Sequence, residues 1–316
     1  MKKIFIFIVC LMLCGCYNYN ELEDLDIVSS IVVDYKNEEY FIKLEVVDKD
    51  KTKVYDGYGK SLSEAFESIT LVSPNEIFLS HLNTVMFTKD VDLLKLTNYF
   101  LREPKVNTTF YYLLTETRDV YSDINLGEDI YKILDNHHVY NFFHLARIIN
   151  SDNKDIIIPY LNKDKKIESG FIFSNNLPVS EVSYENVEIY KILDNINNAN
   201  LMIDDIDIEL TNVTTNISFN NEFHIDVISN VTVLQNDSEY NLGSEKDIKE
   251  LEDKINENIK NKIINLINIL IKYDSDIFGF QDKLNSKKHN DLLDWEKQKF
   301  KVNVNASISK KGLLKS

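Results

Sequence analysis

All three cysteines of the chain lie within its first sixteen residues, at Cys10, Cys14 and Cys16. They belong to a segment that opens with two lysines and continues with an apolar run over residues 4–13, which is typical of an export signal. The run is shorter than the roughly 20 apolar residues that a membrane-spanning helix needs. Removal of the signal leaves one cysteine at most, so no disulfide can form and the exported fold must be stabilised by packing alone.

The end of this signal, Leu13-Cys14-Gly15, stands directly before Cys16 in the order of a lipoprotein cleavage site. This order predicts cleavage after Gly15 and attachment of lipid to Cys16. One acyl chain binds a membrane only weakly, whereas two or three hold a protein there stably. The alternative is an ordinary signal peptide with a chance cysteine. We favour lipidation because the small residue and the cysteine follow a well-formed apolar run in the right register.

Length and charge limit what the rest of the chain can be. Residues 16–316 exceed the roughly 100–200 residues of a typical domain, which indicates two or more domains. Hydrophobic residues make up 44% of the chain, which is enough for extensive cores. The net charge of −16 repels nucleic acid and anionic lipid headgroups. We therefore expect no nucleic-acid partner, and membrane attachment only through the lipid on Cys16.

We expect a tether at residues 16–22, an N-terminal α+β domain at 23–150, a polar crossing at about 148–168 and a C-terminal domain at 168–313. Period-two apolar patterns in the N-terminal part predict strands, and a capping box that begins at Ser61 predicts a helix. The expected strands are 27–34, 40–47, 77–87 and 109–115, and two further helices are expected at 91–101 and 128–147.

The C-terminal part has two strong patterns. Residues 206–234 alternate between apolar and polar, which predicts an antiparallel meander with one buried face. Residues 244–273 carry an apolar stripe opposite a polar one, which predicts a long amphipathic helix, and a last strand is expected at 300–308. The predicted fold class is therefore α+β, with mixed or antiparallel sheets flanked by helices. The apolar stripe consists of Ile248, Leu251, Ile255, Ile259, Ile263, Leu266 and Leu270.

The chain carries none of the GxSxG, HExxH, P-loop or GxGxxG patterns of common enzymes. His137, His138 and His144 suggest a metal site, but neighbouring helical histidines point about 100° apart and no carboxylate follows at a ligand spacing. We expect a protein that is not an enzyme, with no catalytic residue, metal or cofactor.

Three stretches of sequence recur in one known family. The first reads Gly15-Cys16-Tyr17-Asn18-Tyr19-Asn20-Glu21-Leu22, followed by Ile27-Val28 and Asp34. The second combines Gly59-Lys60-Ser61-Leu62, Phe78-Leu79-Ser80-His81-Leu82 and Leu101-Arg102-Glu103-Pro104. The third runs Asp274-Ser275-Asp276-Ile277-Phe278-Gly279-Phe280, with Trp295 and a closing strand to Gly312. In this order and spacing the chain resembles the Ger(x)C family, the lipoprotein C subunits of nutrient germinant receptors in endospore-forming bacteria.

Two positions depart from the family pattern. Tyr17-Asn18 replaces the usual Trp-Asp beside the lipid site, and Gln281 stands where the family often has glycine. Neither position supplies known chemistry in the family, so the departures concern local conformation.

The resemblance implies an α+β fold and a non-catalytic, lipid-anchored subunit on the outer face of the spore inner membrane. Its implied partners are an A-type and a transporter-like B-type membrane subunit, with which it acts in the germination response. The family assigns no catalytic residues, so its motif positions are candidate docking or structural residues only. These candidates are Ser80, His81, Arg102, Asp276, Phe278 and Gly279.

Two other classes remain open. A solute-binding lipoprotein of an importer would normally show repeated βα units around a cleft, and the alternating strands of 206–234 argue against that. A lipid-anchored hydrolase would need a nucleophile or metal signature, which the sequence lacks.

Overall fold

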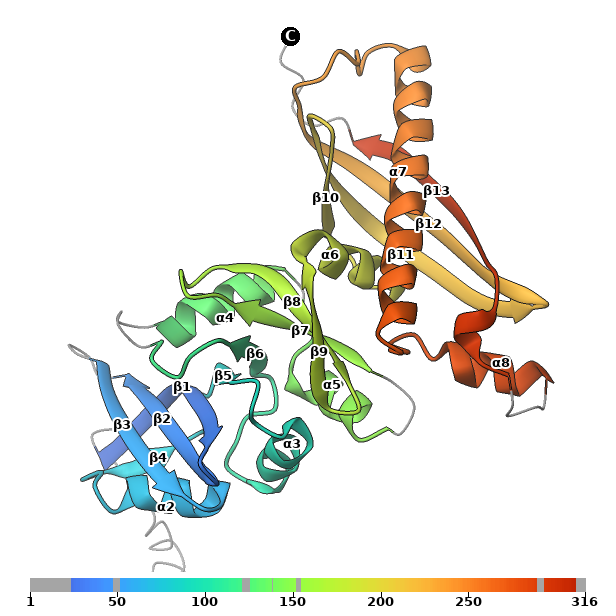
Figure 1. Ribbon diagram of the computed structural model, residues 1–316. Coiled ribbons are helices and arrows are strands. Elements are labelled where there is room, and N and C mark those ends of the chain that lie inside the picture. Colours follow the sequence, from blue (N-terminus) through green and yellow to red (C-terminus); the bar gives the residue numbers. More distant parts are fainter. Residues whose placement is uncertain are drawn as a thin grey trace, which may run out of the picture.

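A computed structural model describes residues 24–47, 52–120, 126–137, 139–151, 155–288 and 293–310. These residues form two lobes, each built around its own sheet with helices beside it (Figure 1). The predicted cleavage site and Cys16 lie outside the described residues. The mixed α+β class predicted from the sequence is confirmed.

The first lobe contains a sheet in the order β3-β2-β1-β5-β6-β7-β8-β9, with β4 beside β1. Its centre, from β1 through β7, is parallel, while both flanks are antiparallel hairpins. The central strands β5, β6 and β7 are buried along their whole length, as expected for parallel strands covered on both faces. The strands are β1 Leu25–Lys36, β2 Glu39–Val47, β3 Thr52–Gly59, β4 Glu76–Phe78, β5 Thr84–Phe87, β6 Tyr111–Thr115, β7 Ile156–Leu161, β8 Ile167–Ser174 and β9 Leu177–Ser183.

Helices cover both faces of this sheet. The helices α2 (Leu62–Thr70), α3 (Leu93–Arg102) and α5 (Phe142–Ile149) share one apolar core, and α4 (Leu126–Asn136) packs on the other face. The predicted capping box begins α2: the Ser61 hydroxyl accepts the Glu64 N–H at 3.2 Å. The Glu64 carboxylate reaches back one residue further than usual, to the N–H of Lys60 at 2.8 Å.

A buried carboxylate joins α4 to the sheet. Glu45 on β2 is completely buried, and its Oε2 accepts hydrogen bonds from the Ser29 and Ser30 hydroxyls at 2.6 and 2.7 Å. The same oxygen accepts the N–H of Gly127 at 3.0 Å, in the first turn of α4. Gly127 allows this approach, because an added Cβ would lie 2.4 Å from the Ser30 Cβ. A helix N-terminus stabilises negative charge, so Glu45 fixes where α4 begins on the sheet.

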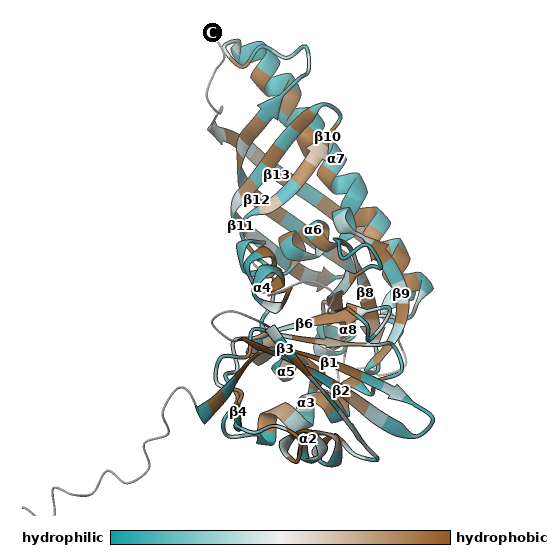
Figure 2. Ribbon diagram, turned by 90° about the vertical axis from the view of Figure 1, so that its left-hand side faces the viewer, coloured by the Kyte–Doolittle hydropathy of each residue, from teal (hydrophilic) through white to brown (hydrophobic). Residues whose placement is uncertain are grey.

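The second lobe is a sheet in the order β10-β11-β12-β13, packed against long helix α7. Apolar and polar residues alternate along β11 and β12, visible as brown and teal bands in Figure 2. The last strand, β13, runs parallel to β12, so this sheet is mixed. The elements are α6 Tyr184–Leu193, β10 Ala199–Ile203, β11 Ile206–Asn220, β12 Glu222–Asn236, α7 Glu245–Lys272, α8 Phe280–Lys288, the 3-10 helix η2 Trp295–Lys297 and β13 Phe300–Lys310.

The amphipathic pattern of α7 is confirmed. Ser244 caps the helix, Tyr273 follows it, and every predicted stripe residue except Ile248 is buried. Ile248 lies in the first turn, where it is only half-buried. The asparagines of the opposite, polar stripe, Asn261, Asn265 and Asn268, are exposed. In the part of the chain that the structure describes, no helix is long and apolar enough to cross a membrane.

Several sequence-based boundaries were wrong. The expected strand 77–87 is two short parallel strands, β4 and β5, and the expected helix 128–147 is two helices on opposite faces of the sheet. The expected meander 206–234 is one hairpin of two 15-residue strands that turns at Asn221, whose φ of 62° suits asparagine. Strands β3, β9 and β10 were not expected.

The predicted crossing at 148–168 contains a buried strand instead of a linker. Ile156–Leu161 is β7, and the first sheet continues beyond it to β9. Pro159 lies inside this strand, although proline cannot donate a hydrogen bond to a ladder. It is tolerated because β6 pairs only with Tyr160 and Leu161, so the ladder on that side ends before Pro159.

Candidate docking site at the lobe junction

The two lobes share apolar packing. Ile157, Ile172 and Val182, from β7, β8 and β9, belong to the core of the second lobe. The segment after α7 meets them: Asp274 takes a left-handed conformation with φ 49°, and the Ser275 N–H donates to Leu270 O at 3.0 Å. This turn directs the Asp274–Phe280 motif toward the first lobe.

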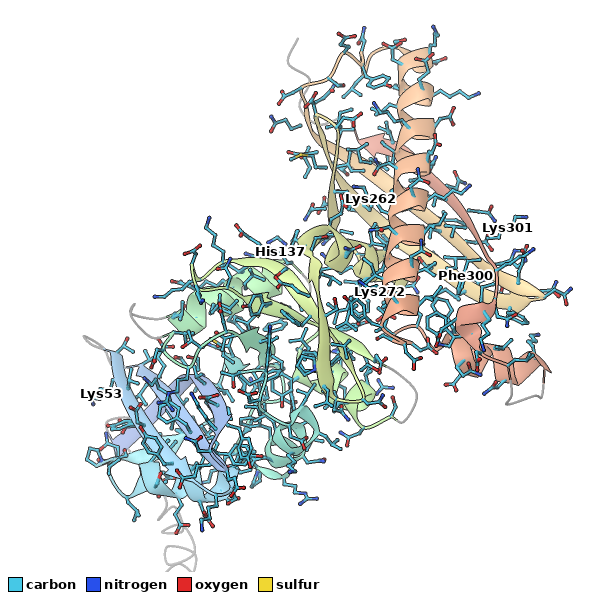
Figure 3. The ribbon with its side chains drawn as sticks, viewed as in Figure 1. Lys53, His137, Lys262, Lys272, Phe300 and Lys301 are labelled. Atoms are coloured by element: carbon cyan, nitrogen blue, oxygen red, sulfur yellow. The ribbon has the colours of Figure 1, made fainter. Side chains whose placement is uncertain are left out.

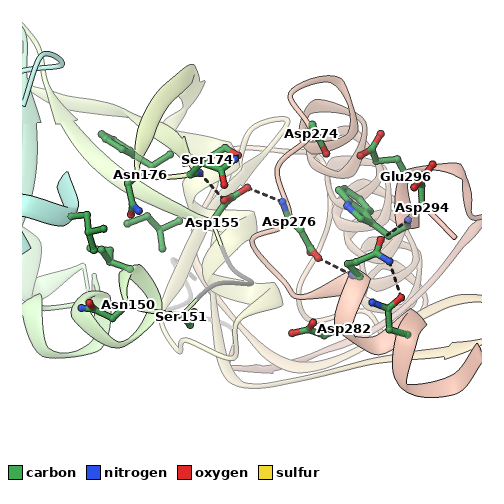
Figure 4. A pocket seen from close by; sticks show the side chains of 18 of the residues that line it. Asn150, Ser151, Asp155, Ser174, Asn176, Asp274, Asp276, Asp282, Asp294 and Glu296 are labelled. Atoms are coloured by element: carbon green, nitrogen blue, oxygen red, sulfur yellow. Dashed lines mark hydrogen bonds between the residues drawn. The ribbon is translucent and has the colours of Figure 1, made fainter. Parts of the chain in front are cut away.

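A pair of aspartates joins the lobes directly. The Asp276 N–H donates to Asp155 Oδ2 at 3.0 Å, and the Asp155 N–H approaches Asp276 O at 3.4 Å (Figure 4). Asp155 Oδ1 also accepts the Asn175 N–H at 3.3 Å, between β8 and β9. The Asp155 carboxylate therefore connects β7, the β8–β9 turn and the motif of the second lobe.

Asp276 also starts α8. Its two carboxylate oxygens accept the N–H groups of Phe280 and Gln281 at 2.7 and 2.8 Å. Burial raises the pKa of Asp276, while these two N–H donors act in the opposite direction. Gly279 precedes the helix with φ 67°, a conformation that glycine adopts without strain. The entry into α8 thus explains why aspartate stands at 276 and glycine at 279. No partner protein is needed to explain these two residues.

Phe278 is a core residue. It is buried, with its ring centroid 6.0 Å from that of Tyr190 on α6 and 5.7 Å from that of Phe280. Phe280 in turn stacks on Trp295 at 5.1 Å. The aromatic residues of the motif therefore pack α6, α8 and η2 together.

Gln281, the departure from the family pattern, has a defined structural role. Its Nε2 donates to Asn285 Oδ1 and to Leu293 O, both at 2.8 Å, and its Oε1 accepts the Trp295 N–H at 3.1 Å. A glycine at this position could make none of these three side-chain bonds. In this chain Gln281 holds the segment that leads to Trp295.

A polar cavity of about 900 Å³ lies at this junction. Its lining comes from both lobes: α3, α5, β7 and β8 on one side, and α8 with the residues around η2 on the other. Six carboxylates and one lysine line it, namely Asp155, Asp274, Asp276, Asp282, Asp294, Glu296 and Lys297. A strongly acidic cavity of this kind disfavours anionic ligands.

One of these carboxylates, Glu296, has a raised pKa. A hydrogen bond that protonated Glu296 donates to Asp274, with burial and the charges of Asp274 and Asp294, raises the pKa of Glu296 from 4.5 to about 7. Between pH 4.5 and pH 7 the folded protein therefore holds a proton on Glu296 that the unfolded chain has released. This contribution to stability is lost as the pH rises through 7.

We expect Glu296→Gln to remove this pH dependence. The wild-type melting temperature should fall between pH 5 and pH 8 relative to that of Glu296→Gln, because only the wild type acquires a second adjacent negative charge. Thermal melts of both proteins across this range measure the difference. A difference that stays constant with pH would contradict the raised pKa of Glu296.

The candidates of the first lobe lie elsewhere. The Ser80 hydroxyl donates to Lys105 O at 2.9 Å, and His81 is exposed next to the Phe78 ring at 5.9 Å. Arg102 is exposed in the last turn of α3, where a cation is favourable, and lines a second cavity of about 640 Å³. None of these three residues lines the junction cavity. The structure therefore separates the six motif candidates into two groups.

Sequence reasoning missed Asp155 and the Asp274–Glu296 pair. Asp155 and Asp276 meet across 121 residues, and no local pattern distinguishes either from the many other acids.

The structure shows where the histidines that suggested a metal site lie. His137 Nδ1 hydrogen-bonds the Tyr184 hydroxyl at 2.8 Å, His144 Nδ1 bonds Asn141 Oδ1 at 2.8 Å, and His138 lies outside the described residues. Among the described residues, no three His, Cys, Asp or Glu side chains are arranged to hold a metal.

Two family models match consecutive parts of the chain. Residues 18–163 match the family described as spore germination protein N-terminal domain, and residues 172–312 match the family described as spore germination B3/GerAC like, C-terminal. The chain therefore belongs to the Ger(x)C family of spore germination proteins, as its motifs indicated.

A solved structure shows the same fold. The crystal structure of the GerBC protein is 14% identical, with a TM-score of 0.58, and the match covers 88% of this chain and 96% of that one. A search of curated proteins found no match. The chain is thus a spore germination protein of this family, and its fold is similar to that of the GerBC protein.

Proposed function

We propose that this protein is the lipid-anchored C subunit of a nutrient germinant receptor. In this proposal it acts without chemistry of its own on the outer face of the spore inner membrane. It assembles there with an A-type and a transporter-like B-type subunit. The observation that carries the proposal is that both family matches occur in order and together span nearly the whole described chain.

The geometry supports a rigid, non-catalytic role. The lobes are joined by shared apolar packing and by the Asp155–Asp276 bonds, so the chain can present surfaces on both lobes in a fixed relation. Asp276, Phe278 and Gly279 have structural roles that account for their presence. His81 and Arg102 are exposed, and we propose them as the better candidates for docking to the membrane subunits.

The junction cavity gives the solute-binding alternative one supporting observation, because such proteins bind ligands between two lobes. The topology opposes it. The second lobe is built from a long antiparallel hairpin with one parallel edge strand, and not from repeated βα units.

Deleting the gene should weaken or abolish the germination of dormant spores on one set of nutrients. Cys16→Ala should behave much like the deletion, because an acidic protein without its lipid has no other strong membrane affinity. The measurement is the loss of spore refractility after nutrient addition, with related receptors removed first.

Two controls accompany this experiment. Germination by agents that bypass nutrient receptors should persist in both strains, and lipid labelling should be lost from Cys16→Ala alone. Normal germination of the deletion strain on every nutrient would refute the receptor role and favour the solute-binding alternative. Normal lipid labelling of Cys16→Ala would refute the anchor.

A further inference from the structure

One corner of the first lobe exposes two adjacent apolar side chains. Leu71 and Val72 follow α2 and are 81% and 64% exposed, and Leu71 is the most exposed large hydrophobic residue in the described part of the chain. Their backbone is ordered by hydrogen bonds: the N–H of Leu71 donates to Glu67 O at 3.2 Å, and that of Val72 to Ile69 O at 3.0 Å. This corner therefore displays apolar surface on a fixed turn.

The same corner lies beside the start of β1. The Ser73 hydroxyl donates to Asp26 Oδ2 at 2.5 Å, and Asn75 Nδ2 donates to Asp26 Oδ1 at 3.2 Å. Leu25, the first residue of β1, pairs with Glu76, which begins β4. The turn that carries Leu71 and Val72 is thus held against the point where the chain leads back toward Cys16.

The length of that connection limits where the membrane can be. The segment from Cys16 to Leu25 spans at most about 30 Å even when it is fully extended. An anchored lobe must therefore keep this corner within that distance of the lipid, whereas the second lobe is connected to the lipid only through the first lobe.

The charges around the corner are compatible with a bilayer surface. Asp26 is buried, and Glu76 forms an ion pair with Lys105 at 2.5 Å. Lys53 on β3 lies at the outer edge of the same lobe (Figure 3). Glu67 is exposed one turn before Leu71, which limits the corner to shallow insertion, with its carboxylate at headgroup level.

We propose that Leu71 and Val72 enter the headgroup region of the membrane beside the lipidated Cys16, so that the first lobe lies on the bilayer in one orientation. This inference rests on the anchor proposed above. The lipid supplies the attachment, and the two side chains add a second point of contact that fixes the rotation of the lobe about its tether.

A single-thiol experiment tests this orientation. In the mature chain Cys16 is the last cysteine and its sulfur is blocked by lipid, so Leu71→Cys introduces the one reactive thiol. The lipidated protein is labelled there with an environment-sensitive fluorophore and reconstituted into phosphatidylcholine vesicles that contain nitroxide-labelled lipid. Met202→Cys is the matched control, because Met202 is 65% exposed but lies on β10 of the second lobe.

We expect the label at position 71 to shift its emission to shorter wavelength and to lose roughly half of its intensity to the nitroxide lipid, while the label at position 202 stays unchanged. In a second protein, a label on Thr70→Cys should be quenched in the same way, and adding Leu71→Asp and Val72→Asp should reduce this quenching to the control level. That loss would show that the apolar side chains, and not proximity alone, hold the corner in the bilayer.

Vesicle flotation separates the possible failures. A protein that floats with vesicles but whose labels at 71 and 202 behave alike retains its anchor and refutes the inserted corner. If the protein does not float with the vesicles, the anchor is refuted. The proposal for Leu71 and Val72 then fails as well, because no tether places them near a membrane. A label at 71 that is shielded only in membranes containing the other receptor subunits assigns the corner to a protein contact and also overturns the proposal.

Discussion

Replacing Ile263 with aspartate is expected to destabilise the protein by about 4 kcal/mol. Ile263 is completely buried at the middle of α7, where this helix packs on the sheet of the second lobe. The substitution removes apolar packing and places a charge among side chains that cannot pair with it. Urea or thermal unfolding of residues 17–316 measures the loss.

Asn261→Asp is the matched control on the same helix. Asn261 lies on the exposed stripe, and the same added charge there should change the stability by about 0.5 kcal/mol or less. Equal destabilisation by both substitutions would show that α7 does not pack through the face assigned to it.

Glu45→Ala is expected to cost about 3 kcal/mol. The substitution removes the acceptor of the Ser29 and Ser30 hydroxyls and of the Gly127 N–H, and it leaves a cavity under α4. Buried donors without a partner cost more than the hydrogen bonds themselves contributed. We expect both a lower unfolding midpoint in urea and faster hydrogen exchange of the α4 amides.

Glu39→Ala on the same strand provides the comparison. Glu39 is exposed at the start of β2, so its loss should stay within about 0.5 kcal/mol. If Glu45→Ala is as mild as Glu39→Ala, the buried carboxylate does not hold α4 on the sheet.

The sequence predicted the structure best where one hydrophobic period extends over a long segment. The stripe of α7 repeats every three to four residues over 28 residues, so both its ends and its buried face could be predicted. The alternation along β11 and β12 gave their buried faces but not their number, because nothing in the pattern marked Asn221 as the turn instead of several shorter loops. Strand β3 is mostly exposed and shows no apolar alternation, and β10 has only five residues, so neither could be recognised.

The candidate site was less predictable because its contacts are distant in sequence. The motif residues Asp276 and Gly279 were found through family resemblance, and the structure assigns them to the entry of α8. Asp155, the partner of Asp276, lies in a polar stretch that was interpreted as a crossing. The role of Glu45 also depends on a partner that is distant in sequence. Its strand was predicted, but only the tertiary structure shows that a helix N-terminus meets its carboxylate.

The parallel pairing of β12 with β13 has a consequence for the order of folding. Residues of β13 join partners far back along the chain, as in the bond from Asn303 to Asp226 across 77 residues. Such contacts form slowly, because a long loop must close before they are gained. If the chain is exported from its N-terminus, the first lobe can fold early, whereas the edge of β12 stays open until residue 310 has crossed. We expect this late-closing edge to be the part of the nascent protein that most needs protection from aggregation.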